Sequence, residues 1–203
     1  MWLAFYNPAA SGDVLMLTND HQTKHPQVQR VDKVALVTDS QSKEVVAVNI
    51  FNLSDYFEMD QVGNVTLTDE QLSIINELIH ASGFDTVIEL DNSPKFVVGY
   101  VESCEPVEGS DHLSLTQTNI GTETLQIVCG ASNIRQGLHV MVAKPGAVMP
   151  SGAIIWPGEL RNVKSYGMIC SARELGLTIE GTEVGIWELD ETLEPGMALA
   201  DVL

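Results

Sequence analysis

The chain has 203 residues, enough for one large domain or two small ones, each able to bury a hydrophobic core. Its hydrophobic share of 44% and charged share of 19% are typical of a globular protein and exclude a disordered one. The 10 lysines and arginines stand against 28 acidic residues and give a net charge of −18, whereas proteins that bind nucleic acid usually carry a basic surface.

The N-terminal residues show no targeting pattern. Residues 1–8 have no basic region before their apolar residues and no small-residue cleavage site after them, so we expect no secretory signal and a cytoplasmic protein. No apolar run approaches the roughly 20 residues that cross a bilayer, and we expect no membrane partner. The three cysteines, Cys104, Cys129 and Cys170, lack C-x-x-C spacing and lie in or beside apolar runs. Buried reduced thiols are expected, with a zinc site or a disulfide as the alternative.

Residues 1–94 predict a small α+β domain whose role the sequence does not indicate. Residues 33–38 and 44–50 are rich in β-branched side chains and are joined by a polar link, which predicts an antiparallel hairpin. Thr68 and Gln71 form a capping-box pattern that predicts the start of a helix. Apolar residues follow on one face of that helix, and Gly83 is placed to end it.

The turn-forming residues Asp91 to Pro94 mark the predicted domain boundary. A division after Pro94 gives the first part 4 cations and 14 acidic residues, a net charge of −10, and the second part 6 cations and 14 acidic residues, a net charge of −8. Neither part is basic. Any contact with RNA must therefore come from a local cluster of cations, which predicts weak affinity with a strong dependence on salt.

Residues 95–203 predict an all-β barrel with a C-terminal extension. Four or five short apolar runs, among them residues 96–101, 124–129 and 138–143, are separated by turns that contain Gly, Asn and Pro. Such a pattern within about 100 residues fits a small closed barrel, of which the OB-fold is the common version that binds oligonucleotides. Spacing alone does not distinguish the OB-fold from another small barrel.

Two motifs in this barrel combine apolar runs with polar tips. Residues 127–134 join a strand to Gly, Ser and Asn, and residues 159–171 carry Arg161 and Lys164 three positions apart. Cations hold phosphate, while hydroxyl and amide groups reach sugar or base edges, so this combination suits an RNA backbone beside an unstacked base.

These motifs resemble the tRNA-binding domain that begins the bacterial phenylalanyl-tRNA synthetase beta subunit and that also occurs in the endothelial monocyte-activating polypeptide family. The resemblance extends from Lys95 to about Leu189 and rests on the opening strand and on segments in the same order: residues 110–113, 127–133, 142–147, 160–171 and 173–177. With its leading domain, the whole chain is similar to the stand-alone bacterial proteins of the YtpR type.

The resemblance implies an OB-fold that binds tRNA by its shape, without catalysis, cofactor or metal. It also implies a synthetase or a ribosomal component as a further partner and a possible homodimer. Lys144, Arg161 and Lys164 would bind phosphate, and Met168 would pack against a ribose or base. The implied contacts are completed by three residues that would donate hydrogen bonds to sugar or phosphate oxygens: Asn133, Ser165 and Ser171.

Other interpretations remain open at this level. The acidic barrel could keep the family fold yet dock a basic translation-related protein, and Arg161 and Lys164 could form a solvated surface. The apolar segment from Pro195 to Ala200 could form a dimer interface or close the fold. An enzyme is the least supported class, because the sequence shows no nucleophile–base pair and no set of metal ligands.

Overall fold

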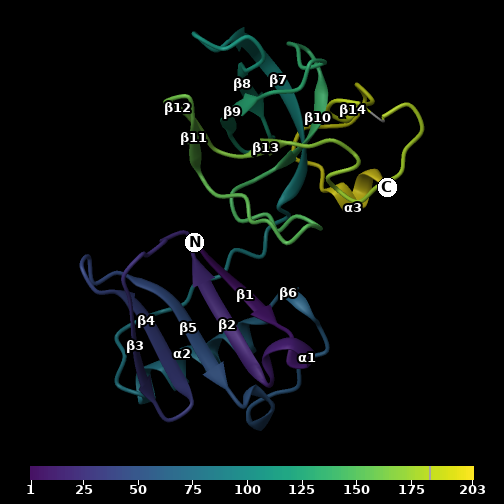
Figure 1. Ribbon diagram of the computed structural model, residues 1–203. Helices are drawn as coiled ribbons and strands as arrows, with labels where there is room; N and C mark the ends of the chain where they lie inside the picture. The colour runs from purple at the N-terminus through teal and green to yellow at the C-terminus, as the bar shows by residue number, and fades with distance from the viewer. Residues whose placement is uncertain (183) are drawn as a thin grey trace. The chain divides into compact units, whose positions relative to one another are not determined.

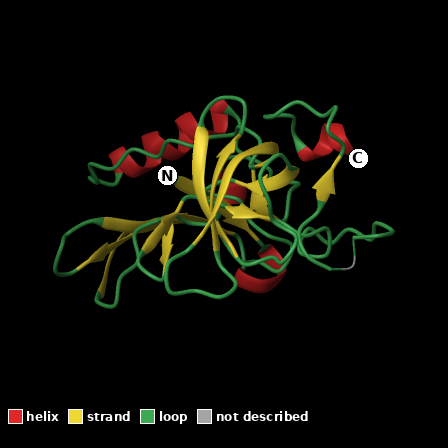
Figure 2. Cartoon of the chain, turned by 90° about the horizontal axis from the view of Figure 1, so that it is seen from above, coloured by secondary structure: helices red, strands yellow, loops and turns green. Residues whose placement is uncertain are grey.

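The computed structural model describes residues 1–182 and 184–203. It divides the chain into two compact units, Met1–Asn92 and Ser93–Leu203 (Figure 1). Strands and loops predominate in both units, and the 13-residue helix α2 is the long helix of the described chain (Figure 2). No helix among the described residues is both long and apolar enough to span a bilayer.

The first unit is β-rich. Its six antiparallel strands form one sheet in the order β3-β4-β5-β2-β1-β6. The predicted hairpin is present as the antiparallel pair of β4 and β5, and the helix predicted after Thr68 is α2. The elements are β1 (Trp2–Tyr6), α1 (Pro8–Ser11), β2 (Val14–Asn19), β3 (Pro26–Val31), β4 (Val34–Asp39), β5 (Val45–Phe51), the 3₁₀ turn η1 (Leu53–Asp55), β6 (Gly63–Val65) and α2 (Asp69–Ala81).

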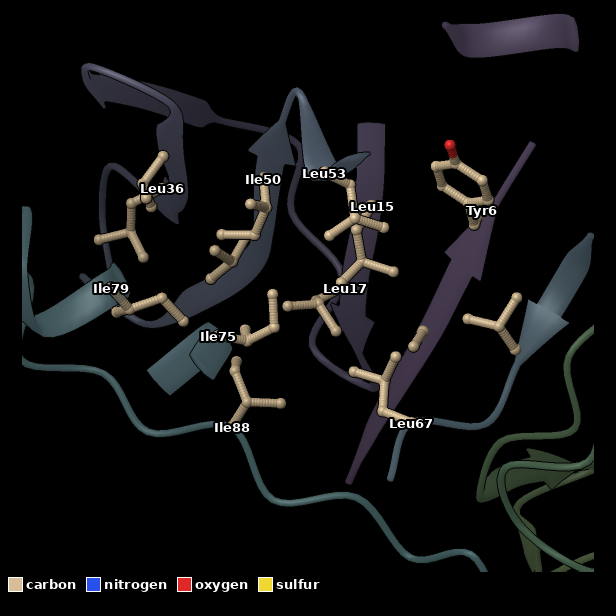
Figure 3. Packing of buried hydrophobic residues seen from close by; sticks show 14 of the residues in the cluster. Tyr6, Leu15, Leu17, Leu36, Ile50, Leu53, Leu67, Ile75, Ile79 and Ile88 are labelled. Atoms are coloured by element: carbon tan, nitrogen blue, oxygen red, sulfur yellow. The ribbon is translucent and has the colours of Figure 1, made fainter. Parts of the chain in front are cut away.

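One face of this sheet is buried and carries the core of the unit. Buried and half-buried residues alternate along β2 and β5, as expected for strands with a single covered face. Leu15, Leu17 and Ile50 from the sheet pack with Ile75 and Ile79 of α2, and all five are fully buried (Figure 3). The helix therefore supplies the cover that the hydrophobic face of the sheet requires.

Local capping determines where α2 begins and ends. The Thr68 hydroxyl accepts a hydrogen bond from the Gln71 backbone N–H at 3.2 Å, and the Gln71 side chain accepts one from the Thr68 N–H at 2.9 Å. This is the predicted capping box, which satisfies two donors that a helix start leaves unpaired. Gly83 follows the helix with φ +80°, a conformation that favours glycine.

The second unit contains a six-stranded antiparallel sheet, in which five strands follow the order β13-β10-β7-β8-β9 and β14 pairs with β10. Strand β7 is the longest and bends at a register shift between Val101 and Ser103. The elements are β7 (Phe96–Pro106), β8 (Ser114–Asn119), β9 (Thr124–Cys129), β10 (His139–Ala143), β11 (Gly158–Leu160), β12 (Val163–Ser165), β13 (Met168–Ile169), β14 (Glu188–Leu189) and α3 (Leu199–Val202).

Both faces of this sheet are buried along β10. Val140 and Val142 belong to one hydrophobic cluster, whereas Met141 and Ala143 belong to a second cluster on the other face. Met197 and Leu199 of the apolar tail pack on that second cluster, so this tail closes the fold of its own unit. A sheet covered on both sides explains why apolar residues in its strands are consecutive and not alternating.

Residues 164–169 join the two ends of the sheet. The Tyr166 N–H donates to the Gln126 carbonyl in β9 at 2.8 Å, while Met168 pairs with Ala143 in β10. The Gln126 side-chain amide also donates to the Lys164 carbonyl at 2.7 Å. The sheet thus curls until β9 and β10 are linked through this segment, as the pattern of short strands predicted for a closed barrel.

The cysteines lie in or near the core of this unit. Cys129 and Cys170 are buried, and Cys104 is half-buried. Burial raises the pKa of the Cys170 thiol to about 12, because a thiolate is poorly solvated there. Cys129 and Cys170 are therefore protonated packing residues at neutral pH.

Candidate nucleic-acid interface

Arg161 lies at the tip of the β11–β12 hairpin. Strand residues Leu160 and Val163 pair directly, so Arg161 and Asn162 form a two-residue turn. Both have positive φ values, 51° and 62°, as a type I′ turn requires. The side chain of Arg161 is exposed, and its guanidinium donates one long hydrogen bond of 3.5 Å to the Gly109 carbonyl. A single weak contact leaves most of its donors available to a ligand.

Lys164 is exposed on the same hairpin. Its cross-strand neighbour is Glu159, which lowers the local positive potential, but the structure gives the ammonium group no ion pair among the described residues. Leu160 and Tyr166 flank these cations with 44% and 37% of their surfaces exposed. The hairpin therefore offers two cations beside apolar and aromatic surface, a composition suited to phosphate and sugar.

Lys144 lies close to the same segment. It follows Ala143, which pairs with Met168, and a Cβ on Gly167 would lie only 2.8 Å from the Ala143 carbonyl oxygen. Gly167 is thus held against the peptide before Lys144, and two residues of chain separate it from Lys164. The three Cα–Cα steps from Lys164 to Gly167 span at most about 11 Å. The structure therefore brings the three predicted phosphate-binding cations to one part of the barrel.

Asn133 is used within the fold. Its amide nitrogen donates to the Ile186 carbonyl at 3.1 Å and to Glu188 at 3.0 Å, and its amide oxygen accepts from the Ile186 N–H at 2.9 Å. Arg135 makes a bidentate pair with the same Glu188, which lowers the pKa of that carboxyl group. Asn133 therefore ties the loop after β9 to residues 186–188 instead of presenting its amide to a ligand.

Ser165 is buried and also has partners within the protein. Its hydroxyl donates to the Gly167 carbonyl at 3.2 Å and accepts from the Val128 N–H at 3.1 Å. It satisfies a buried donor at the edge of β9, where the sheet is joined by residues 164–169. This position is not exposed to a phosphate or sugar oxygen.

Ser171 caps the turn that follows β13. Its N–H and hydroxyl both donate to one carboxylate oxygen of Glu174, at 2.8 and 2.7 Å, and its hydroxyl accepts from the Glu174 N–H at 3.2 Å. These reciprocal bonds resemble those of a capping box. The side chain of Ser171 is thus a local structural group in this conformation.

Met168 and Arg173 line a hollowed region of the second unit. Met168 is half-buried and contributes to two cavities of about 360 and 530 Å³. Arg173 contributes to both of these and to a third cavity of about 580 Å³. Sequence reasoning placed Arg173 in a family segment but gave it no function. The available signal was a cation two residues after Ser171, at the start of the next family segment, residues 173–177.

In comparisons with known proteins, the two units match different family models. Residues 96–198, about half of the chain, match the family model described as "Putative tRNA binding domain". Residues 21–91 match the model described as "Domain of unknown function (DUF4479)".

Two curated relatives show different extents of similarity. The chain is 44% identical over 196 residues to "Putative tRNA-binding protein YtpR" of Bacillus subtilis (strain 168), and the match covers 96% of this chain and 98% of that protein. It is 46% identical over 127 residues to the phenylalanine–tRNA ligase beta subunit of Oceanobacillus iheyensis, which covers 62% of this chain but 15% of that subunit. Similarity to the ligase thus concerns a small part of the ligase subunit.

A solved structure titled "Crystal structure of MetRS related protein from Pyrococcus horikoshii" is 21% identical to the chain. The match covers 54% of this chain and 97% of that one, with a TM-score of 0.39, which is too low to show a shared fold.

Proposed function

Since the chain belongs to the tRNA-binding-domain family, we propose that it binds tRNA without catalysing a reaction on it. The second unit would act as an OB-fold that recognises the shape and the phosphates of folded RNA. The names of its relatives support a binding role and not a catalytic one. The matching of residues 96–198 to the family model supports placing this role in the second unit.

The observation that carries the proposal is the pair of exposed cations on the β11–β12 hairpin, with the half-buried Lys144 beside it. Arg161 and Lys164 have few or no partners within the described residues, and Lys144 lies close to the same segment. A lysine or arginine that is not neutralised by the protein gains most when it releases counterions from phosphate. In a chain with a net charge of −18, such a cluster is the part of the surface best suited to RNA.

The implied contact residues divide into two groups under this proposal. Lys144, Arg161 and Lys164 would bind phosphate, and Met168 would contact a sugar or base. Asn133, Ser165 and Ser171 would position the loops that carry these groups, because their donors already have partners in the protein.

A filter-binding titration with bulk tRNA at two salt concentrations tests the proposal. Affinity should fall steeply with salt, and Arg161→Ala with Lys164→Ala should weaken binding and reduce the slope of log K against log salt by about 1 to 2. Lys24→Ala with Arg30→Ala is the matched control, since it removes the same charge from the first unit. If both double variants bind tRNA as the parent does, the hairpin is not the binding surface.

A protein-docking module is the second candidate, and the acidic balance of residues 95–203 favours it. In this case a basic protein related to translation would occupy the surface, and RNA would not bind at physiological salt. Absence of tRNA binding at low salt, where electrostatic attraction is strongest, would favour this candidate.

The same proposal extends to the role of the first unit, to the location of the protein and to its partners. We assign the first unit an accessory role and an α+β class, supported by the packing of α2 on its sheet. A cytoplasmic location follows from a role with tRNA. A synthetase or ribosomal component as partner and a homodimer would be tested by co-purification and by analytical ultracentrifugation.

A further inference from the structure

Three cavities of the second unit meet at one cation. Arg173 lines the cavities of about 360, 530 and 580 Å³, and Met168 lines the first two. These volumes lie within the range of about 300–1,000 Å³ that is typical of small-molecule sites in proteins. A ligand at this position would therefore contact the thioether of Met168 and the guanidinium of Arg173 together.

The charge of Arg173 is not neutralised by its neighbour. Glu174 adjoins it in sequence, but one oxygen of that carboxylate accepts hydrogen bonds from both the N–H and the hydroxyl of Ser171. Arg173 is exposed, and the structure gives its side chain no ion pair among residues 1–182 and 184–203. Glu174 lines the same two cavities as Met168, and Glu180 lines the third, but neither carboxylate forms an ion pair with Arg173. A guanidinium without such a pair keeps its planar donors for a phosphate or carboxylate.

The lining of the 360 Å³ cavity is mixed. Gly130 and Gly185 contribute wall without side chains, and the other lining residues include apolar ones and polar or charged ones: Val128, Ile169, Ile186 and Met168, and Ser171, Arg173 and Glu174. The part of this wall that the two glycines and the apolar residues form accommodates a flat ring, and the sulfur of methionine makes favourable contacts with aromatic rings. The chemistry that matches a flat apolar ring joined to an anion is that of a nucleotide.

We propose that this cavity receives one unstacked nucleotide of the bound RNA, with its base against Met168 and its phosphate on Arg173. The inference rests on the proposed function and adds a binding group, Arg173, that lies outside the hairpin. The hairpin cations hold phosphates in any RNA, whereas the cavity admits only a base that has left its stack. Recognition would thus combine a general phosphate surface with one site that requires a single-stranded nucleotide.

Methyl NMR tests the cavity without depending on tRNA. Methionine-methyl-labelled protein is titrated with adenosine 5′-monophosphate, and the Met168 signal is identified by its loss in Met168→Leu. We expect the nucleotide to shift this signal and Arg173→Ala to weaken the interaction about tenfold, as loss of one charged hydrogen-bonding partner does. Adenosine without phosphate should bind the parent and Arg173→Ala alike. Arg135→Ala is the control, because it removes an equal charge from a residue that lines none of these cavities.

A second measurement uses one RNA sequence as a single strand and as a duplex. Arg173→Ala should weaken binding of the single strand about tenfold but that of the duplex less than twofold. A Met168 signal that does not move, or equal losses for both RNA forms, would overturn the inference while tRNA binding by the hairpin still stood. Saturation by micromolar nucleotide in protein that binds no RNA would instead show a site for a free nucleotide and would overturn it as well.

Discussion

The β11–β12 hairpin and the contacts that close the second unit use polar side chains in opposite ways. On the hairpin, Arg161 and Lys164 are exposed and make at most one long hydrogen bond within the described residues. We define the closing contacts as the side-chain hydrogen bonds of Asn133, Ser165 and Ser171. Those of Asn133 and Ser165 satisfy backbone groups of distant segments, and those of Ser171 join it to Glu174 in the same turn. Both groups draw on residues 159–171, and Asn133 comes from the other motif, residues 127–134.

This difference shows that residue type within a motif does not determine its role. A serine or asparagine whose donors are satisfied inside the protein contributes to folding stability, and its loss leaves a buried partner unpaired. An exposed cation contributes little to stability but much to attraction of a polyanion. Substitutions should therefore separate the two groups: one set should lower the free energy of unfolding, and the other should lower affinity for RNA.

Gly185→Ala should give the largest loss of stability. A Cβ at this position would lie 2.1 Å from the amide oxygen of Asn133, and the residue has a φ of +81° that side chains rarely adopt. The Asn133 side chain would have to leave its hydrogen bonds to Ile186. We expect a loss of about 2–4 kcal/mol in the free energy of unfolding. Urea unfolding in a Trp2→Phe background measures it, because Trp156 and Trp187 then report on the second unit alone.

A double-mutant cycle checks the cause of that loss. Asn133→Ala should cost about 2 kcal/mol by itself, since it leaves the Ile186 backbone groups without their partner. In that background Gly185→Ala should cost only the strain of its backbone, about 1–2 kcal/mol, because the steric clash has been removed. Additive losses would show that Gly185 and Asn133 act independently.

Ser165→Ala should have the next largest effect. The substitution leaves the buried Val128 N–H without its acceptor and weakens the link between β9 and residues 164–169. We expect a loss of about 1–3 kcal/mol, measured by the same urea unfolding. Ser151→Ala is the control, since this exposed serine makes one long contact at 3.4 Å. If Ser165→Ala had the same free energy of unfolding as the control, the hydrogen bonds of Ser165 would not stabilise the fold.

Arg161→Gly should separate stability from binding. Glycine adopts the positive φ of this turn without steric cost, so the free energy of unfolding should stay the same or rise by up to about 1 kcal/mol. The same change removes one hairpin cation, and affinity for tRNA should fall with a smaller salt slope. Reduced stability in the urea assay would show that Arg161 contributes to folding as the closing contacts do. Unchanged tRNA affinity in filter binding would show that Arg161 does not contribute to RNA binding.

The sequence predicted those features that depend on local pattern. The capping box of α2, the β4–β5 hairpin and the short strands of the barrel arise from neighbouring residues, and the structure contains all of them. The closing contacts of Asn133 and Ser165 could not be predicted, because they join distant positions. Asn133 bonds to a residue 53 positions later, and Ser165 to one 37 positions earlier. No periodicity in a single sequence indicates which loop faces which.

Whether a strand is buried on one face or on both also limited what its apolar pattern could predict about the core. The first unit covers its sheet on one side, so alternation along β2 and β5 identifies the inner residues. Strand β10 is buried on both faces, and its continuous apolar run does not indicate which residues belong to which core. The sequence pattern also did not show whether Met168 lies in the core, and its predicted contact with a ribose or base came from the resemblance; in the structure it is half-buried and lines two cavities.

The smallest effect should come from the Arg135–Glu188 pair beside Asn133. Arg135 is the main cause that lowers the pKa of Glu188, and the Asn133 amide adds to the effect. A carboxyl group with a lowered pKa stabilises the fold above its unfolded pKa, and this contribution is lost as pH falls through the folded value. Both side chains are more than a third exposed, so screening keeps the gain small. Urea midpoints at pH 7 and pH 4 should therefore differ slightly more in the parent than in Glu188→Gln, which cannot titrate. A larger drop in Glu188→Gln would reverse the sign of this linkage and assign the acid sensitivity of the second unit to other carboxyl groups.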